Sequence, residues 1–168
     1  METTNKTETI SVNTSINGKP RQFAVEPRMH LADALREIVD LTGTKVGCEQ
    51  GICGTCTILV DGQPMRSCLM LAVQAEGKQL ETIEGLNTGP SLTVLQDSFQ
   101  RNHALQCGFC TAGILNTARA FLKENPSPTR DEVREALSGN ICRCTGYENI
   151  VDAIVDPAVL KVAQEGGL

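Results

Sequence analysis

Eight cysteines divide into two groups of four, and the spacing within each group is typical of metal–sulfur sites rather than of disulfides. The first quartet consists of Cys48, Cys53, Cys56 and Cys68. Its C-x4-C-x2-C run with a distant fourth cysteine is the spacing of plant-type [2Fe–2S] sites. The second quartet consists of Cys107, Cys110, Cys142 and Cys144. Two such quartets, with no cysteine left over, indicate electron transfer.

The loop of the first quartet is rich in glycine. Gly47, Gly51 and Gly54 alternate with the cysteines. Glycine accepts positive φ and lets the backbone approach a cluster closely, so that amide N–H groups can donate to the sulfurs and raise the reduction potential. Structural zinc sites usually show two C-x2-C-like pairs, so zinc is the weaker alternative here. A disulfide network is not favoured in a chain that has the features of a cytosolic protein.

The second quartet places cysteines at two predicted helix ends. Cys107 and Cys110 come just before a helix that starts near residue 112, whereas Cys142 and Cys144 follow a helix end at Gly139. Two such pairs can meet across a helical bundle, and a helix N-terminus favours the negative charge of a thiolate cluster. A C-x-C pair strains an intramolecular disulfide. By itself this quartet could also bind zinc.

The elements that must position the first quartet have the order of a β-grasp domain. Alternating apolar residues on both sides of Asn17-Gly18 predict a β-hairpin, because both turn residues accept positive φ. The other predicted elements are a helix over 30–41 that stops near Gly43, and strands over 57–60 and 79–84. A mixed sheet that wraps one helix agrees with the ferredoxin-like spacing of the cysteines.

The second half of the chain has helical periodicity. Ser91 is a candidate N-cap for a helix with Leu92, Leu95 and Phe99 on one face. Thr129 and Glu132 form a capping box. The remaining predicted helices are 111–124, 147–155 and 157–164. The predicted fold class is therefore α+β: a β-grasp ferredoxin domain (8–84), a linker (85–91) and a small helical bundle (92–160).

Composition and charge exclude several classes of function. The net charge of -5 and the lack of clustered Lys and Arg argue against nucleic-acid binding. No segment approaches the roughly 20 apolar residues of a membrane span, and the polar N-terminus has no secretory h-region, so we expect a cytoplasmic protein. The chain has no Gly-rich dinucleotide fingerprint and no paired nucleophile and base. We therefore expect no catalytic site on this chain alone.

Three motifs resemble the iron–sulfur subunit of the molybdenum hydroxylases, the family of xanthine dehydrogenase, aldehyde oxidoreductase and aerobic carbon monoxide dehydrogenase. They are GCEQGICGTC (47–56), QCGFCTAG (106–113) and NICRCTGY (140–147), in this order. The resemblance covers about residues 8–160 and includes all eight cysteines. The fold that it implies is a β-grasp ferredoxin domain followed by a four-helix bundle.

The resemblance implies a role for each quartet. Cys107, Cys110, Cys142 and Cys144 would hold the [2Fe–2S] cluster nearer to a molybdenum–pterin cofactor. Cys48, Cys53, Cys56 and Cys68 would hold the cluster on the flavin side. Gln106 matches a glutamine that hydrogen-bonds the pterin, and Cys144 matches the ligand nearest to the pterin. The implied partners are a large molybdenum-binding subunit and a medium FAD-binding subunit, in a heterotrimer or its dimer.

Two further functions remain as alternatives. The first is a stand-alone two-cluster ferredoxin, which would not need Gln106 before Cys107 or a helical half beside a pterin. The second is a zinc-stabilised interaction module, against which the glycines of the 47–56 loop argue. General resemblance to bacterial three-subunit members favours an N-heteroaromatic substrate such as quinoline, with carbon monoxide, aldehydes and purines as alternatives.

Overall fold

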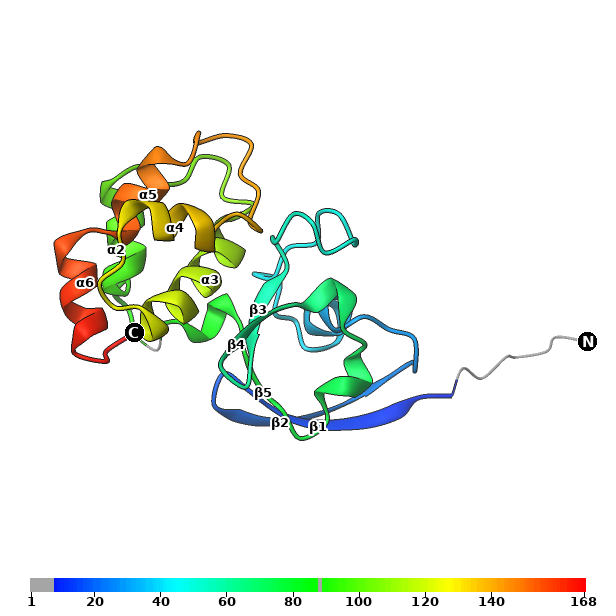
Figure 1. The fold of residues 1–168 in the computed structure, drawn as a ribbon. Coiled ribbons are helices and arrows are strands. Elements are labelled where there is room, and N and C mark those ends of the chain that lie inside the picture. Colours follow the sequence, from blue (N-terminus) through cyan, green and yellow to red (C-terminus); the bar gives the residue numbers. More distant parts are fainter. Residues whose placement is uncertain (1–7, 88) are drawn as a thin grey trace, which may run out of the picture.

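A twisted sheet with short helices, formed by the first half of the chain, lies beside a group of longer helices formed by the second half (Figure 1). The computed structural model describes residues 8–87 and 89–168. This arrangement confirms the predicted α+β class, with a ferredoxin-like part followed by a helical part.

The predicted hairpin begins the sheet. Strand β1 (Ile10–Ile16) pairs antiparallel with β2 (Lys19–Val25). Asn17 and Gly18 between them have φ of 52° and 74°, as a two-residue turn that matches the strand twist requires. Alternate side chains of β1 are buried under the sheet, and the hairpin prediction is confirmed.

Three further strands complete a mixed five-stranded sheet in the order β2-β1-β5-β3-β4. They are β3 (Thr57–Val60), β4 (Gln63–Arg66) and β5 (Gln79–Glu81). Strand β1 pairs parallel with β5, and the other pairs are antiparallel. All four residues of β3 are buried, because this strand has the sheet core on one face and the helical half on the other. The predicted strand over 79–84 is shorter in the structure, and a 3-10 turn (Ile83–Gly85) replaces its end.

The helix predicted over 30–41 is shorter and less regular than its sequence pattern indicates. A single α-helical turn, α1 (Leu31–Asp33), widens into a π-helix (Ala34–Ile38), in which the Val39 N–H donates to the Ala34 carbonyl. Asp40 then has a φ of 62°, which ends the helix before Gly43. The Arg36 guanidinium donates to the Thr42 and Thr44 carbonyls, so it fixes the chain as it turns toward the cysteine loop. Two 3-10 turns lie between β4 and β5, at Ser67–Leu69 and Ala72–Ala75.

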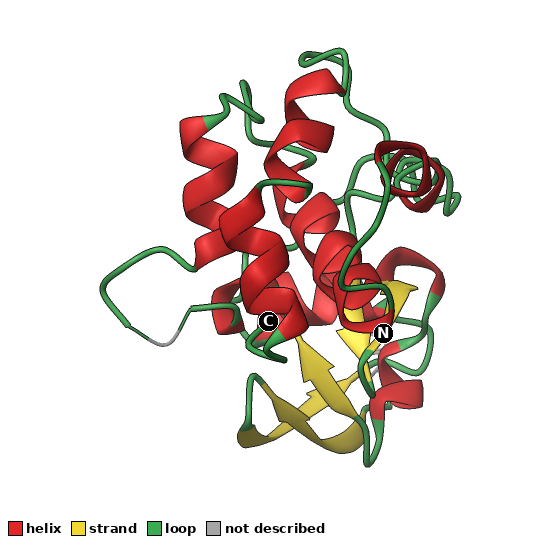
Figure 2. Cartoon of the chain, turned by 60° about the vertical axis from the view of Figure 1, so that its left-hand side comes forward, coloured by secondary structure: helices red, strands yellow, loops and turns green. Residues whose placement is uncertain are grey.

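Five helices form the second half in the described residues from 89 onward (Figure 2). They are α2 (Val94–Arg101), α3 (Thr111–Glu124), α4 (Arg130–Ala136), α5 (Glu148–Ile154) and α6 (Pro157–Gln164). Their core is apolar, with Phe99, Ile114, Leu122 and Ile150 almost fully buried. Among residues 8–87 and 89–168, no helix has the length and apolar character needed to cross a bilayer.

The N-cap predicted for α2 was wrong by two residues. Thr93 rather than Ser91 caps this helix, because its hydroxyl accepts from the Gln96 N–H while the Gln96 side chain accepts from the Thr93 N–H. Leu92 therefore lies outside the helix and is half exposed. A polar side chain at the third helical position decides which of two neighbouring hydroxyl residues becomes the cap.

The capping box of α4 is present as predicted, and it gives a stability prediction. The Thr129 hydroxyl accepts from the Glu132 N–H, and the Glu132 carboxylate accepts from the Thr129 N–H at 2.7 Å. We expect Thr129→Ala to lower the free energy of unfolding by about 1 kcal/mol, because it removes one side of this box. Denaturant unfolding of the iron-loaded chain measures the effect. Thr129→Ser keeps the hydroxyl and should match the wild type; equal losses in both variants would contradict the role of the cap.

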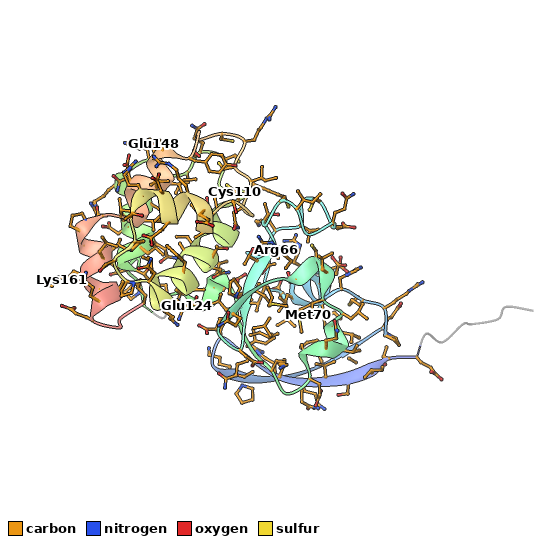
Figure 3. All side chains as sticks on the ribbon, viewed as in Figure 1. Arg66, Met70, Cys110, Glu124, Glu148 and Lys161 are labelled. Carbon is orange, nitrogen blue, oxygen red and sulfur yellow. The ribbon has the colours of Figure 1, made fainter. Side chains whose placement is uncertain are left out.

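A partly buried set of polar contacts joins the two halves. The Asn116 side chain on α3 donates to the Thr57 carbonyl at 2.9 Å, and Arg119 forms a 2.5 Å ion pair with Glu81 on β5. Arg66, at the end of β4, donates to the Gly139 carbonyl at 2.7 Å and lies at the junction of the halves in Figure 3. Each of these contacts joins a residue of the sheet to a residue of the helical half. Together they hold the helical half against the sheet.

Candidate metal centres

The first quartet surrounds the loop that enters β3. Cys48 and Cys53 lie in this loop, Cys56 lies next to the first residue of β3, and Cys68 lies in the 3-10 turn after β4. Backbone amides of the loop point at the first thiol: Cys53 N and Gln50 N are each 3.4 Å from Cys48 Sγ. These amides lower the pKa of Cys48 to about 7. The loop therefore stabilises a thiolate at its exposed end.

Gly51 and Gly54 give this loop its shape. Their φ values are 76° and 71°, in the left-handed region that favours glycine. The loop conformation that the alternating glycines predicted is thus present. Cys56 and Cys68 are each only 2% exposed, and their side chains are in contact. Burial and the neighbouring thiol raise the pKa of Cys68 to about 11.

The second quartet lies where two helix ends meet. Cys110 is the N-cap residue of α3 and is labelled in Figure 3, whereas Cys142 and Cys144 lie in the loop between α4 and α5. Cys144 Sγ lies 3.6 Å from Cys107 Sγ at the surface. Below this pair, Cys110 contacts the buried Cys142, and burial raises the pKa of Cys110 to about 12. The predicted meeting of the two cysteine pairs is present.

Thr145 and Tyr147 order the loop of the second quartet. The Thr145 hydroxyl donates to Cys142 Sγ at 3.1 Å, and the Cys142 N–H donates to the Tyr147 hydroxyl at 2.8 Å. Burial favours the neutral Cys142 thiol, but the Thr145 hydroxyl and nearby amides prevail and lower its pKa. Tyr147 has a φ of 71° at the N-cap of α5. Neither residue is among the site residues predicted from the sequence, although Thr145 lies only three residues after Cys142.

The sulfurs meet in pairs, which suits a two-iron cluster. The pairs in contact are Cys48 with Cys53, Cys56 with Cys68, Cys107 with Cys144, and Cys110 with Cys142. A [2Fe–2S] cluster takes two thiolates on each iron. No group of three or more His, Cys, Asp or Glu side chains within 8–87 and 89–168 is arranged to hold a single metal ion. Crowded thiols with raised pKa values become stable thiolates when bound metal supplies positive charge.

The two quartets approach each other through the backbone. The Ile141 N–H, next to Cys142, donates to the Cys53 carbonyl at 2.8 Å. The side chain of the buried Asn140 donates to the Gly54 carbonyl at 3.1 Å. In Figure 1 the orange loop after α4 accordingly runs toward the cyan loop before β3. One hydrogen bond thus joins Cys53 of the first quartet to Ile141, the residue before Cys142 of the second.

Gln106 lies at the exposed end of the second quartet. It is exposed and directly precedes Cys107, whose sulfur contacts that of Cys144. Its assignment to a pterin stays a prediction. Its exposed side chain is accessible to a group bound outside this chain.

Two family profiles match the chain and divide it between the quartets. The "2Fe-2S iron-sulfur cluster binding domain" matches residues 14–85, and the "[2Fe-2S] binding domain" matches residues 82–155. The match over residues 14–85 contains the whole 48–68 quartet, and the match over residues 82–155 contains the whole 107–144 quartet.

Relatives with known roles match over nearly the whole chain. The small subunit of nicotine 6-hydroxylase from Paenarthrobacter nicotinovorans is 53% identical over 93% of this chain and 94% of the relative. Subunit gamma of caffeine dehydrogenase from Pseudomonas sp. (strain CBB1) is 50% identical over 85% of this chain and 87% of the relative. In the solved structure of quinoline 2-oxidoreductase from Pseudomonas putida 86, a chain that is 69% identical superposes with a TM-score of 0.94, over 95% of this chain and 99% of that one.

Proposed function

The chain belongs to the iron–sulfur subunits of the molybdenum hydroxylases, and from this membership we propose which of its residues carry electrons and in which direction. As such a subunit it is the electron-transfer component of a multi-subunit oxidoreductase and carries two [2Fe–2S] clusters. When bound, each cluster accepts and releases one electron at a time. The observation that carries the proposal is the pairwise contact of eight thiols in two quartets.

The pairs predict which thiolates share an iron. In the first quartet, Cys48 and Cys53 would bind one iron, and Cys56 and Cys68 the other. In the second quartet, the exposed pair is Cys107 with Cys144, and the inner pair is Cys110 with Cys142. In each quartet, one iron would be held by the more exposed pair of thiolates and the other by the more buried pair.

The two quartets have different positions in the electron path. Electrons enter at the exposed Cys107–Cys144 pair, beside Gln106, which would hydrogen-bond a pterin of the large subunit. They leave at the 47–56 loop toward a flavin of the medium subunit. The hydrogen bond from Ile141 to the Cys53 carbonyl supports this order, because it brings the segment of the second quartet next to the 47–56 loop. The residues of this chain would bind the two clusters, shield them from water and hold them at a fixed separation. The substrate would be bound on another subunit.

The partners we propose are a large molybdenum-binding subunit and a medium FAD-binding subunit, in a heterotrimer or its dimer. Relatives named as small and gamma subunits support an assembly with other chains. We also propose a cytoplasmic location. Eight free cysteines support it, because a reducing compartment keeps thiols available for iron. Within the chain we propose a division into 8–84, 85–91 and 92–160.

For the substrate of the complex we propose an N-heteroaromatic compound of the quinoline type. Support comes from relatives named for nicotine, caffeine and quinoline, which are all nitrogen-containing ring compounds. The test is to co-purify the partner subunits and to screen quinoline-type rings, purines, aldehydes and carbon monoxide with an artificial electron acceptor. Turnover of aldehydes or carbon monoxide, with none of the heteroaromatic compounds, would contradict the proposal.

Metal content tests the ligand assignment directly. We expect about four irons and four acid-labile sulfides per chain, because eight thiolates fill two clusters. Iron and sulfide assays on the purified complex, together with its visible absorption, measure this. About one zinc per quartet, with no visible absorption beyond that of the flavin, would refute the iron–sulfur assignment. Chelation of the iron should bleach the absorption and lower the stability of the chain, as metal loss does in small domains.

A further inference from the structure

Each quartet contains one thiol that contacts a threonine hydroxyl. In the first quartet, Thr55 Oγ1 lies 3.2 Å from Cys53 Sγ. In the second quartet, Thr145 Oγ1 lies 3.1 Å from Cys142 Sγ. A thiolate that binds iron has no proton to donate, so in the loaded protein each hydroxyl must be the donor.

The surroundings of Thr55 hold its hydroxyl at the sulfur. Thr55 is 5% exposed, so its side chain is shielded from water. A Cβ at Gly47 would lie 3.1 Å from Thr55 Oγ1 and 3.2 Å from Cys53 Sγ, which is tighter than ordinary packing. The absence of a side chain at Gly47 therefore leaves room for the contact between hydroxyl and sulfur.

A second hydrogen bond orients the hydroxyl of Thr145. The Tyr147 N–H donates to Thr145 Oγ1 at 3.2 Å. Because this bond occupies an acceptor site of the oxygen, the proton of the hydroxyl is left to point at Cys142 Sγ. Tyr147 in turn accepts from the Cys142 N–H, so the loop closes around one thiol.

The two hydroxyl-bonded cysteines are also the two that the backbone connects. From Cys142 the chain leads to Ile141, whose N–H donates to the Cys53 carbonyl at 2.8 Å. Both threonines thus act on thiolates at the boundary between the quartets. Hydrogen bonds to the sulfurs are among the means by which a protein sets the potential of an iron–sulfur cluster, because they stabilise the more negative, reduced state.

We propose that Thr55 and Thr145 are positioning residues that set how an electron divides between the two clusters. The hydrogen bond from Thr55 stabilises the reduced form of the cluster held by the 48–68 quartet. The hydrogen bond from Thr145 stabilises the reduced form of the cluster held by the 107–144 quartet. In the transfer, one ferrous iron of the second quartet becomes ferric and one ferric iron of the first becomes ferrous; no bond breaks and no proton moves. Both roles require the ligand sets proposed above, in which Cys53 and Cys142 bind iron.

The test is the distribution of one electron over the two clusters in the assembled complex. Under anaerobic conditions the complex is reduced with one electron per pair of clusters, and low-temperature EPR measures the ratio of the two cluster signals. We expect Thr55→Val to shift the ratio about tenfold toward the 107–144 cluster, and Thr145→Val to shift it about tenfold in the opposite direction. A tenfold shift corresponds to about 59 mV for a one-electron couple. The double variant should return close to the wild-type ratio.

Serine variants are the matched controls, because serine keeps the hydroxyl. Thr55→Ser and Thr145→Ser should keep the wild-type ratio. Unchanged ratios in the valine variants at full iron content, or equal shifts in the serine and valine variants, would overturn the proposal. If a valine variant loses iron, the smaller Thr→Ala variant at the same position takes its place with the same expected shift. A wild-type complex without two cluster signals would instead refute the proposed function itself.

Discussion

Replacing Cys110 with alanine is expected to remove the second cluster and to slow electron delivery from substrate to flavin by more than about 100-fold. Loss of a residue that only supports a metal ligand already costs about 10–100-fold. Cys110 is a proposed ligand at the N-cap of α3, and its thiol contacts the buried Cys142. Alanine would leave that iron with one protein thiolate inside the helical half. Iron assays should show the loss of about two of four irons.

A matched variant of the other quartet tests the direction of transfer. Cys48→Ala should also lose about half of the iron, because it removes one ligand of the 48–68 cluster. In that variant the substrate should still bleach the 107–144 cluster rapidly, whereas reduction of the flavin should be slow. In Cys110→Ala the remaining 48–68 cluster should stay oxidised when substrate is added. Stopped-flow absorption measures both. Bleaching of the 48–68 cluster at the wild-type rate in Cys110→Ala would show that electrons do not enter through the second quartet.

The approach of the cysteines within each quartet could be predicted, because their spacing and the glycines between them constrain the local backbone. The loop around Cys48 and Cys53 must turn tightly, so glycines stand at fixed offsets, and Gly51 and Gly54 do have positive φ. The C-x-C pair of Cys142 and Cys144 likewise lies in one short loop. The individual sulfur contacts of the second quartet could not be predicted, because Cys107 and Cys110 meet Cys144 and Cys142 from a distant loop of the chain.

Element boundaries were harder to predict where two local signals competed. Ser91 and Thr93 can both cap a helix, and the side chain of Gln96 decides in favour of Thr93. The apolar pattern over 30–41 predicts a regular helix, but Asp40 turns left-handed, and Arg36 binds carbonyls of the next loop. Tertiary contacts of this kind override periodicity.

The contacts that set the distance between the quartets have no signature in the sequence. Asn140 and Gly54 are 86 residues apart, and neither belongs to a ligand set. Thr145 differs, since it lies three residues after Cys142, within reach of a local hydrogen bond from a hydroxyl to a sulfur. A search for Ser or Thr near each cysteine would therefore have found Thr145, but not Asn140.

Gly113→Ala is expected to have the largest effect on how the two halves pack. A Cβ on Gly113 would lie 2.3 Å from the Gly54 carbonyl oxygen and 3.0 Å from that of Thr55. Both atoms are backbone, so no side chain can rotate away, and α3 must move off the loop of the first quartet. Overpacking of this kind costs about 1–3 kcal/mol, occasionally more. Alanine gains about 1 kcal/mol over glycine within a helix, so a net loss of stability would come from the clash.

The same displacement should slow electron exchange between the clusters. Gly54 also lies against the segment of the second quartet: a Cβ there would lie 2.3 Å from the Gly139 carbonyl oxygen and 2.8 Å from the Asn140 amide nitrogen. Moving the 53–55 loop would therefore break the hydrogen bonds that Ile141 and Asn140 make to it. We expect Gly113→Ala to keep its full iron content while the transfer rate between clusters falls by roughly tenfold, in line with the effect of supporting residues on metal sites.

Gly89→Ala is the control: among the described residues, the one atom that a Cβ added at Gly89 would meet within 4 Å, apart from its chain neighbours, is Asn87 Oδ1 at 3.9 Å. Thermal unfolding and the intercluster rate should both be close to the wild type in this variant. A Gly113→Ala protein as stable as Gly89→Ala would mean that α3 can shift without cost. A destabilised Gly113→Ala protein with a normal intercluster rate would mean that the hydrogen bonds from Ile141 and Asn140 survive the shift. The combined loss of stability and rate is expected only if close backbone contact at Gly113 and Gly54 holds the two quartets together.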